Sequence, residues 1–203
     1  MKHLSVVASL GLMTLLGACA SRQPVEDSSS PPISRPSESL SAYYPLAVGN
    51  RWTYRVNGRD DKPVTVEILK EEDGYFRDNQ GGQLAVDDFG VRDRKRYLLR
   101  GPLNEGAQWT NVVSVSSTEH YHITQVGVSC HVPAGDFDSC VRVEGRNRVD
   151  QNTTLVNTLT FARGVGLVRV DLAAENSSGE RVPQTGLELT SYKLQGTSQN
   201  AKH

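Results

Sequence analysis

The residues best suited to chemistry lie between Ser129 and Arg142, where the chain reads SCHVPAGDFDSCVR. Cys130 and Cys140 supply thiols, His131 supplies an imidazole, and the segment carries two aspartates. Thiolate, imidazole and carboxylate are the usual zinc ligands, and a thiol beside a base can act as a nucleophile. In an oxidising compartment, the same two cysteines would instead form a disulfide. The compartment therefore decides among a metal site, a thiol active site and a structural clamp.

His120 and His122 are two further imidazoles, on one side of a predicted strand and about 7 Å apart along it. With His131 they could supply three zinc ligands. They alternate with the apolar Tyr121 and Ile123, so a solvent-facing strand side explains them as well. We predict no metal site and keep these three histidines as candidate ligands.

The sequence lacks the linear motifs of common enzymes. It contains no G-x-S-x-G, H-E-x-x-H, Walker or dinucleotide-binding glycine pattern. We therefore predict no cofactor and no enzymatic activity. A hydrolase whose site is assembled only in space remains an alternative.

A local basic run comprises Arg92, Arg94, Lys95, Arg96 and Arg100. Strand alternation would place several of these cations on one face, where they could bind phosphates such as those of lipopolysaccharide. A solvated edge strand that resists aggregation explains the same run, and we predict that role. The whole chain carries 22 basic and 23 acidic residues, a formal net charge of −1. This balance gives no electrostatic case for nucleic acid or an anionic membrane surface.

The N-terminus indicates the compartment. Lys2 precedes an apolar run from Leu4 to Leu16, which is shorter than the roughly 20 residues of a membrane-spanning helix. The following residues, Leu16-Gly17-Ala18-Cys19, resemble the lipobox of bacterial lipoproteins. The resemblance implies a signal peptide over residues 1–18, with Cys19 as the acylated first residue of the mature chain. An ordinary signal peptide cut near Ala18 or Ala20 is the alternative.

The lipobox resemblance also implies a location. Several acyl chains, palmitate among them, bury many CH₂ groups at about 0.8 kcal/mol each, so anchoring would be stable. Ala20 follows the cysteine where the family's sorting pattern uses aspartate for inner-membrane retention. We expect a lipid-anchored outer-membrane protein whose domain faces the periplasm. Removing residues 1–18 takes away one lysine, so the mature net charge is −2.

In that oxidising compartment, acylation of Cys19 leaves an even pair of thiols, so we predict a disulfide between Cys130 and Cys140. The intervening Pro133-Ala134-Gly135-Asp136 is typical of a turn, which makes the disulfide a clamp on a hairpin. Closing such a loop stabilises by about 3 kcal/mol. Direct pairing of the cysteines would put valines and charged residues on one face. We therefore predict a β-bulge near one cysteine, or a hairpin covered on both faces.

The elements that position these residues are strands. From Tyr43 onward, apolar and polar residues alternate over short segments separated by Gly, Pro, Asn and Asp, at the spacing typical of all-β domains. Trp52 and Trp109 each follow a Gly/Pro turn, and we predict that both anchor the core. The predicted fold is all-β, a single domain of antiparallel strands in a strongly curved sheet or incomplete barrel. A β-sandwich is the alternative.

We divide the chain into four parts. Residues 1–18 are the signal peptide, 19–42 the acylated cysteine with a disordered Ser/Pro-rich tether, 43–196 the β domain, and 197–203 a disordered tail. The tether sequence SRQPVEDSSSPPISRPSESLSA should span roughly 25 Å as a flexible coil.

Three phrases resemble a group of bacterial envelope proteins without an assigned activity, many of them lipoproteins. They are YYPLAVGNRWTY (43–54), VPAGDFDSCVRV (132–143) and FARGVGLVRV (161–170). The resemblance implies a secreted β-rich domain with a curved antiparallel sheet like the half-barrels of lipoprotein carriers.

We therefore expect a non-enzymatic binding or assembly module of the cell envelope. The lipid would hold it at the membrane while the domain engages an envelope protein, lipid or glycan, and no nucleic acid. A carrier of lipid or another apolar ligand in a curved-sheet cavity is the alternative. That alternative predicts a concave face lined by Trp, Leu and Val.

Overall fold

The computed structural model describes residues 40–195 of the 203-residue chain. The chain divides into two units, Met1–Ser34 and Arg35–His203, and the described residues all belong to the second. The predicted signal peptide, Cys19 and the tail 197–203 lie outside the described residues. No helix within residues 40–195 is long and apolar enough to cross a membrane.

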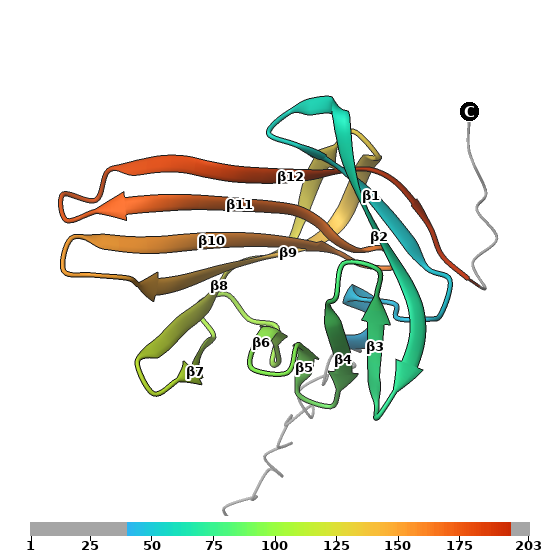
Figure 1. Ribbon diagram of the computed structural model, residues 1–203, viewed down its shortest axis with the longest axis horizontal. Coiled ribbons are helices and arrows are strands. Elements are labelled where there is room, and N and C mark those ends of the chain that lie inside the picture. Colours follow the sequence, from blue (N-terminus) through green and yellow to red (C-terminus); the bar gives the residue numbers. More distant parts are fainter. Residues whose placement is uncertain (1–39, 196–203) are drawn as a thin grey trace, which may run out of the picture. The chain divides into compact units, whose positions relative to one another are not determined.

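Nearly all of the described chain is β-structure (Figure 1), which confirms the predicted fold class. A short 3-10 helix, η1 (Leu40–Tyr43), precedes the strands. The first six strands are β1 (Arg51–Val56), β2 (Arg59–Glu72), β3 (Tyr75–Asp78), β4 (Gln83–Asp87), β5 (Gly90–Arg92) and β6 (Tyr97–Arg100). The second six are β7 (Gln108–Ser114), β8 (Ser117–Val132), β9 (Gly135–Arg148), β10 (Thr153–Ala162), β11 (Gly166–Asn176) and β12 (Arg181–Lys193).

The 12 strands form one sheet in the order β6-β5-β4-β3-β2-β1-β12-β11-β10-β9-β8-β7. Each half is an antiparallel meander of consecutive strands, and the pairing of β1 with β12 joins the halves. The two ends of the sheet, β6 and β7, therefore follow one another in the chain. The sheet curves into a nearly closed barrel (Figure 1), as predicted, in place of the alternative sandwich.

Side chains join β6 to β7 where strand pairing is missing. Asn111 on β7 accepts a hydrogen bond from the Tyr97 backbone N–H at 3.0 Å, and its Nδ2 donates to the Tyr97 carbonyl at 3.1 Å. Trp109 Nε1 donates to the same carbonyl at 2.8 Å. The backbone N–H and carbonyl of Tyr97 on the edge strand β6 are thus hydrogen-bonded, as they would be if another strand paired with β6 there.

The core fills the inside of the curved sheet. Trp52 is fully buried and donates from Nε1 to the Val165 carbonyl at 2.7 Å, and its ring centroid lies 5.4 Å from that of Tyr44. Trp109 is also buried, so both predicted core anchors are confirmed. Other fully buried members of this cluster include Ile68, Val91, Leu99, Ile123, Val141, Val143, Phe161, Val168 and Leu189.

Ion pairs cover the sheet face opposite to the core. Arg146 on β9 pairs with Glu144 on the same strand at 3.1 Å and with Glu175 on β11. Arg181 on β12 completes the network, at 3.0 Å from Glu144 and 2.8 Å from Glu175. Val156 lies on this face as the cross-strand partner of Arg146, yet only 1% of it is exposed. We attribute its burial to the aliphatic stems of the arginines.

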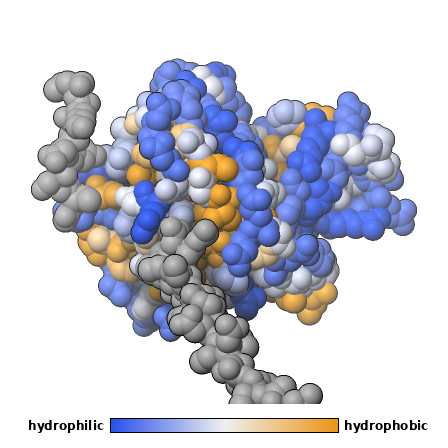
Figure 2. All heavy atoms as spheres, turned by 180° about the vertical axis from the view of Figure 1, so that it is seen from behind, coloured by the Kyte–Doolittle hydropathy of each residue, from blue (hydrophilic) through white to orange (hydrophobic). Residues whose placement is uncertain are grey.

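Hydrophobic residues also reach the surface in separate patches among hydrophilic ones, as the face in Figure 2 shows. The large hydrophobic side chains that are exposed are Val48, Leu69, Phe89, Val112, Val115, Val149 and Val182.

Candidate functional site

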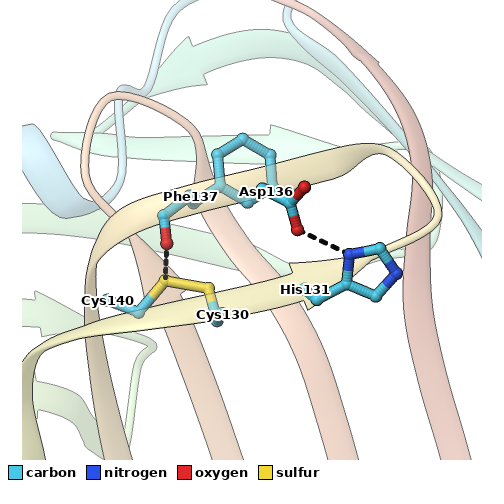
Figure 3. The surroundings of a disulfide bond; sticks show 5 residues. All are labelled: Cys130, His131, Asp136, Phe137 and Cys140. Atoms are coloured by element: carbon cyan, nitrogen blue, oxygen red, sulfur yellow. Dashed lines mark hydrogen bonds and ion pairs between the residues drawn. A yellow bond between two sulfur atoms is a disulfide. The ribbon is translucent and has the colours of Figure 1, made fainter.

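A disulfide joins Cys130 on β8 to Cys140 on β9 (Figure 3), as the sequence predicts. Their Cα atoms are 6.2 Å apart, but the two residues are not cross-strand partners. Cys140 pairs with Val128 and Cys130 with Phe137, and the register shifts on both sides of Val128. Gly127 adopts φ +70°, a conformation that favours glycine. The predicted bulge near a cysteine is therefore confirmed.

The clamped hairpin bends onto β12. Val132 pairs with Gly135, so the turn lies at Pro133 and Ala134, within the predicted turn. The Ala134 N–H donates to the Leu189 carbonyl at 2.9 Å, and Val132 is buried in the core. The disulfide thus holds a hairpin tip that covers part of the core. Its two sulfurs are bonded to each other, so neither cysteine is a free thiol.

The three candidate histidines do not converge. His131 is exposed, and its Nδ1 lies 2.6 Å from the Asp136 carboxylate (Figure 3). His120 contacts Thr110 on β7 at 3.3 Å through Nδ1. No group of three or more metal-ligating side chains forms among residues 40–195.

Arg96, in the loop between β5 and β6, is the centre of a polar site. Its Nε lies 2.9 Å from Asp93 and its guanidinium 3.5 Å from Glu119 on β8. The Tyr121 hydroxyl donates to the second Glu119 oxygen at 3.1 Å. Burial, and then the Glu119 carboxylate, raise the pKa of Tyr121, so its phenol keeps donating. Glu119 is 8% exposed, so its carboxyl group lies on a mostly buried strand face.

Arg96 lines two hollows. The first has a volume of 350 Å³ and is walled by the turns on either side of β5: Asp87, Asp88, Phe89 and Arg92 through Tyr97. The second has a volume of 230 Å³ and lies over β8 to β11, lined also by Glu119, Tyr121, Gly145, Arg146, Asn147, Leu155, Asn157 and Leu172.

The second hollow is a hydrogen-bonding surface built on the sheet. The Tyr121 ring lies against Gly145, where a Cβ atom would come within 2.6 Å of it, so only glycine leaves room for the ring. Asn157 carries a buried Oδ1 with no partner in the described part of the chain. Guanidinium, carboxylate, phenol and amide groups together suit a polar ligand rather than an apolar one.

Two of the cations in the predicted basic run form ion pairs within the domain. Arg92 donates to Asp87 at 2.6 Å, and Arg96 is paired with Asp93 and Glu119. Partial burial raises the pKa of Asp87, but hydrogen bonds from Arg92, Tyr97 and two backbone N–H groups outweigh it, and the pKa is lowered. β6, which ends the run at Arg100, is an edge of the sheet, as predicted.

Sequence reasoning missed the second hollow, because its residues come from four strands and the β5–β6 loop and form no linear motif. One signal was present. Glu119 alternates in phase with Tyr121 and Ile123, so the period-two pattern places a carboxylate on the buried side of β8. A charged residue at such a position needs a partner, and Arg96 provides it.

No protein-family model and no curated protein matches the chain. Two solved structures have a loose likeness to it. A candidate lipoprotein from Parabacteroides distasonis is 12% identical with a TM-score of 0.38, over 75% of this chain and 98% of its own. A candidate exported protein with a YmcC-like fold from Bacteroides fragilis is 13% identical with a TM-score of 0.39, over 73% and 97%. Identities and TM-scores this low support no conclusion about this chain. Its fold follows from its own strand pairing.

Proposed function

We propose that this protein is a lipid-anchored, non-enzymatic binding module of the bacterial cell envelope, held at the outer membrane with its domain in the periplasm. The observation that carries the proposal is the Leu16-Gly17-Ala18-Cys19 lipobox, followed by a Ser/Pro-rich tether and then a folded β domain. Acylation of Cys19 would keep the domain at the membrane, and the tether would let it search for a partner.

The polar site around Arg96 is the surface that we assign to the partner. Arg96, Glu119 and Asn157 offer donors and acceptors on one side of the curved sheet, in a hollow of 230 Å³. A glycan or an extended peptide presents complementary hydroxyl, amide or carboxylate groups.

Two observations support this proposal over its alternatives. Asp87, Glu144 and Glu175 have lowered pKa values, and hydrogen bonds from arginines contribute to each lowering, so these carboxylates are weak proton acceptors. A carrier of an apolar ligand would need a cavity lined by apolar side chains. Here the second hollow is lined mainly by polar groups, and Trp52 is packed into the core.

Metabolic labelling with an alkyne analogue of palmitate tests the anchor. We expect the full chain to incorporate the label and Cys19→Ser to lose it, because acylation requires that thiol. The Cys130→Ala/Cys140→Ala variant serves as the control and should keep the label. Label retained by Cys19→Ser, or absent from all three proteins, would contradict the anchor.

Site-specific photo-crosslinking in cells tests the binding surface. Replacing Asn147, which lines the second hollow, with p-benzoylphenylalanine should capture one defined envelope component. Arg148 is the next residue of β9, on the opposite face and exposed, so the same replacement there is a matched control. Equal capture at both positions, or none at Asn147, would refute this assignment.

A further inference from the structure

Phe89 is displayed at the tip of a rigid turn between β4 and β5. Asp87 Oδ1 accepts hydrogen bonds from the Phe89 N–H at 2.9 Å and the Gly90 N–H at 3.0 Å, which fixes the turn. The side chain is 61% exposed, and it is the only aromatic among the exposed large hydrophobic residues of the described chain. An aromatic ring presented in this way is suited to a membrane interface.

Three exposed cations lie near Phe89 in the structure. Arg94 and Lys95 form the tip of the next turn, where Asp93 Oδ1 accepts from the Lys95 and Arg96 N–H groups at 2.7 Å each. Arg94 lies over the Tyr75 ring at 4.0 Å. Phe89, Arg94 and Lys95 all line the 350 Å³ hollow.

Arg100 is the third cation, on β6 next to the hollow, with its guanidinium 5.5 Å from the centre of the Tyr97 ring. Arg94, Lys95 and Arg100 form no ion pair with any residue that the structure describes. Arg94 Nε donates to the neutral Gln83 Oε1 at 2.7 Å. The three charges are therefore not neutralised by a described carboxylate and can pair with an external anion, unlike those of Arg92 and Arg96.

The N-terminal segment joins the described fold beside this surface. A Cβ atom on Gly101 would lie 3.1 Å from Leu40 Cδ1, and the Gly101 N–H donates to the Phe89 carbonyl at 3.0 Å. Twenty residues separate Cys19 from Leu40. The composition of this stretch predicts a coil, which at this length would span about 25 Å, so an anchored leaflet would lie within reach of Phe89.

We propose that Phe89, Arg94, Lys95 and Arg100 form a docking face for an anionic phospholipid surface. The Phe89 ring enters the headgroup region, and the three cations pair with lipid phosphates. Residues 87–100 carry five basic and three acidic side chains, so this segment is positive although the whole chain is not. The choice of leaflet rests on the proposed lipid anchor, whereas the binding chemistry does not.

Vesicle sedimentation tests the docking face without the anchor. The probe is the mature chain with Cys19→Ser, and the vesicles contain equal parts of phosphatidylethanolamine and phosphatidylglycerol. We expect binding that weakens with added salt and is absent on phosphatidylcholine vesicles. Arg94→Gln/Lys95→Gln should lower the partition coefficient about 30-fold. Phe89→Ala should lower it about fivefold.

A matched control removes the same charge elsewhere. Arg59 and Lys62 are exposed on β2, so Arg59→Gln/Lys62→Gln should leave binding within about twofold of the parent. Near-UV circular dichroism confirms that each variant is folded. Equal losses in both double variants, equal binding to phosphatidylcholine, or no binding at all would overturn the docking face. Palmitate labelling at Cys19 is a separate readout, so failure of docking and failure of the anchor are distinguishable.

Discussion

Asn111 bonds both backbone groups of Tyr97, the N–H at 3.0 Å and the carbonyl at 3.1 Å, where β6 and β7 lack strand pairing. Trp109 shares the carbonyl, but the N–H depends on Asn111 alone among the described contacts. Asn111→Ala should therefore lower the free energy of unfolding by about 1–3 kcal/mol, since a buried donor loses its acceptor. Urea denaturation measures the loss.

Asn157→Ala provides the comparison, because the Asn157 Oδ1 has no partner in the described chain and its removal leaves no donor orphaned. Its effect should be smaller than that of Asn111→Ala. The reverse order would show that the seam between β6 and β7 does not depend on the Asn111 amide.

The Glu144 and Glu175 carboxyls predict a pH dependence of stability. Partial burial raises the pKa of Glu144, but hydrogen bonds from Arg181 and Arg146 outweigh it, and the pKa is lowered. The pKa of Glu175 is lowered mainly by hydrogen bonds from Arg146 and Arg181. In the unfolded chain both titrate near 4.5. Their stabilisation is therefore present above that pH and is lost as the pH falls through the lowered values.

We expect the unfolding free energies of the wild type and of Glu144→Gln/Glu175→Gln to differ at neutral pH and to converge below pH 4.5. Urea titrations across acid pH measure the gap. The difference in unfolding free energy between the wild type and Arg146→Gln/Arg181→Gln should narrow over the same pH range. A gap that stays constant with pH would mean that the ion pairs do not couple to folding.

At the residue scale, the sequence predicted the groups whose environment is local or compositional. The disulfide followed from counting thiols in an oxidising compartment, and Trp52 and Trp109 followed from their places at strand starts. The Arg96 and Glu119 pair was missed because its members are 23 positions apart in the chain. Only the strand order brings the loop after β5 to the side of β8.

At the element scale, the β8–β9 hairpin shows how far a sequence pattern reaches. The valines flanking the cysteines predicted a bulge, because a one-residue register slip would turn them to the wrong face. The register shifts around Val128 confirm it. The pattern could not predict that the tip bends onto β12, since the Ala134 bond to Leu189 joins residues far apart in the chain.

Removing the clamp should loosen this hairpin. Cys130→Ala/Cys140→Ala should lose about 2.5–3 kcal/mol of stability, the loop entropy of a ten-residue separation. Hydrogen exchange should accelerate most at Ala134, whose N–H reaches Leu189. The wild type in reductant should match the variant, and the variant should not respond to reductant. Unchanged exchange at Ala134 would show that the bend persists without the disulfide.

At the scale of the whole molecule, closure of the sheet depends on two joints, one between the first and last strands and one between two consecutive strands. One is the antiparallel pairing of β1 with β12, and the other is the side-chain seam between β6 and β7. Alternating residues and regular turns predicted strands and a curved sheet, but neither joint has a local signal. The joints place β1 to β6 and β7 to β12 around one shared core.

A shared core should make the two halves unfold together. The chain has two tryptophans, Trp52 on β1 in the first half and Trp109 on β7 in the second. In Trp52→Phe, fluorescence reports only on Trp109; in Trp109→Phe, it reports only on Trp52. Each substitution removes a hydrogen bond, so the variants differ in stability. Within each variant, however, the fluorescence and far-UV circular dichroism transitions in urea should coincide. A fluorescence midpoint displaced from the dichroism midpoint in either variant would mean that one meander unfolds without the other, and that the two joints do not bind the halves into one cooperative unit.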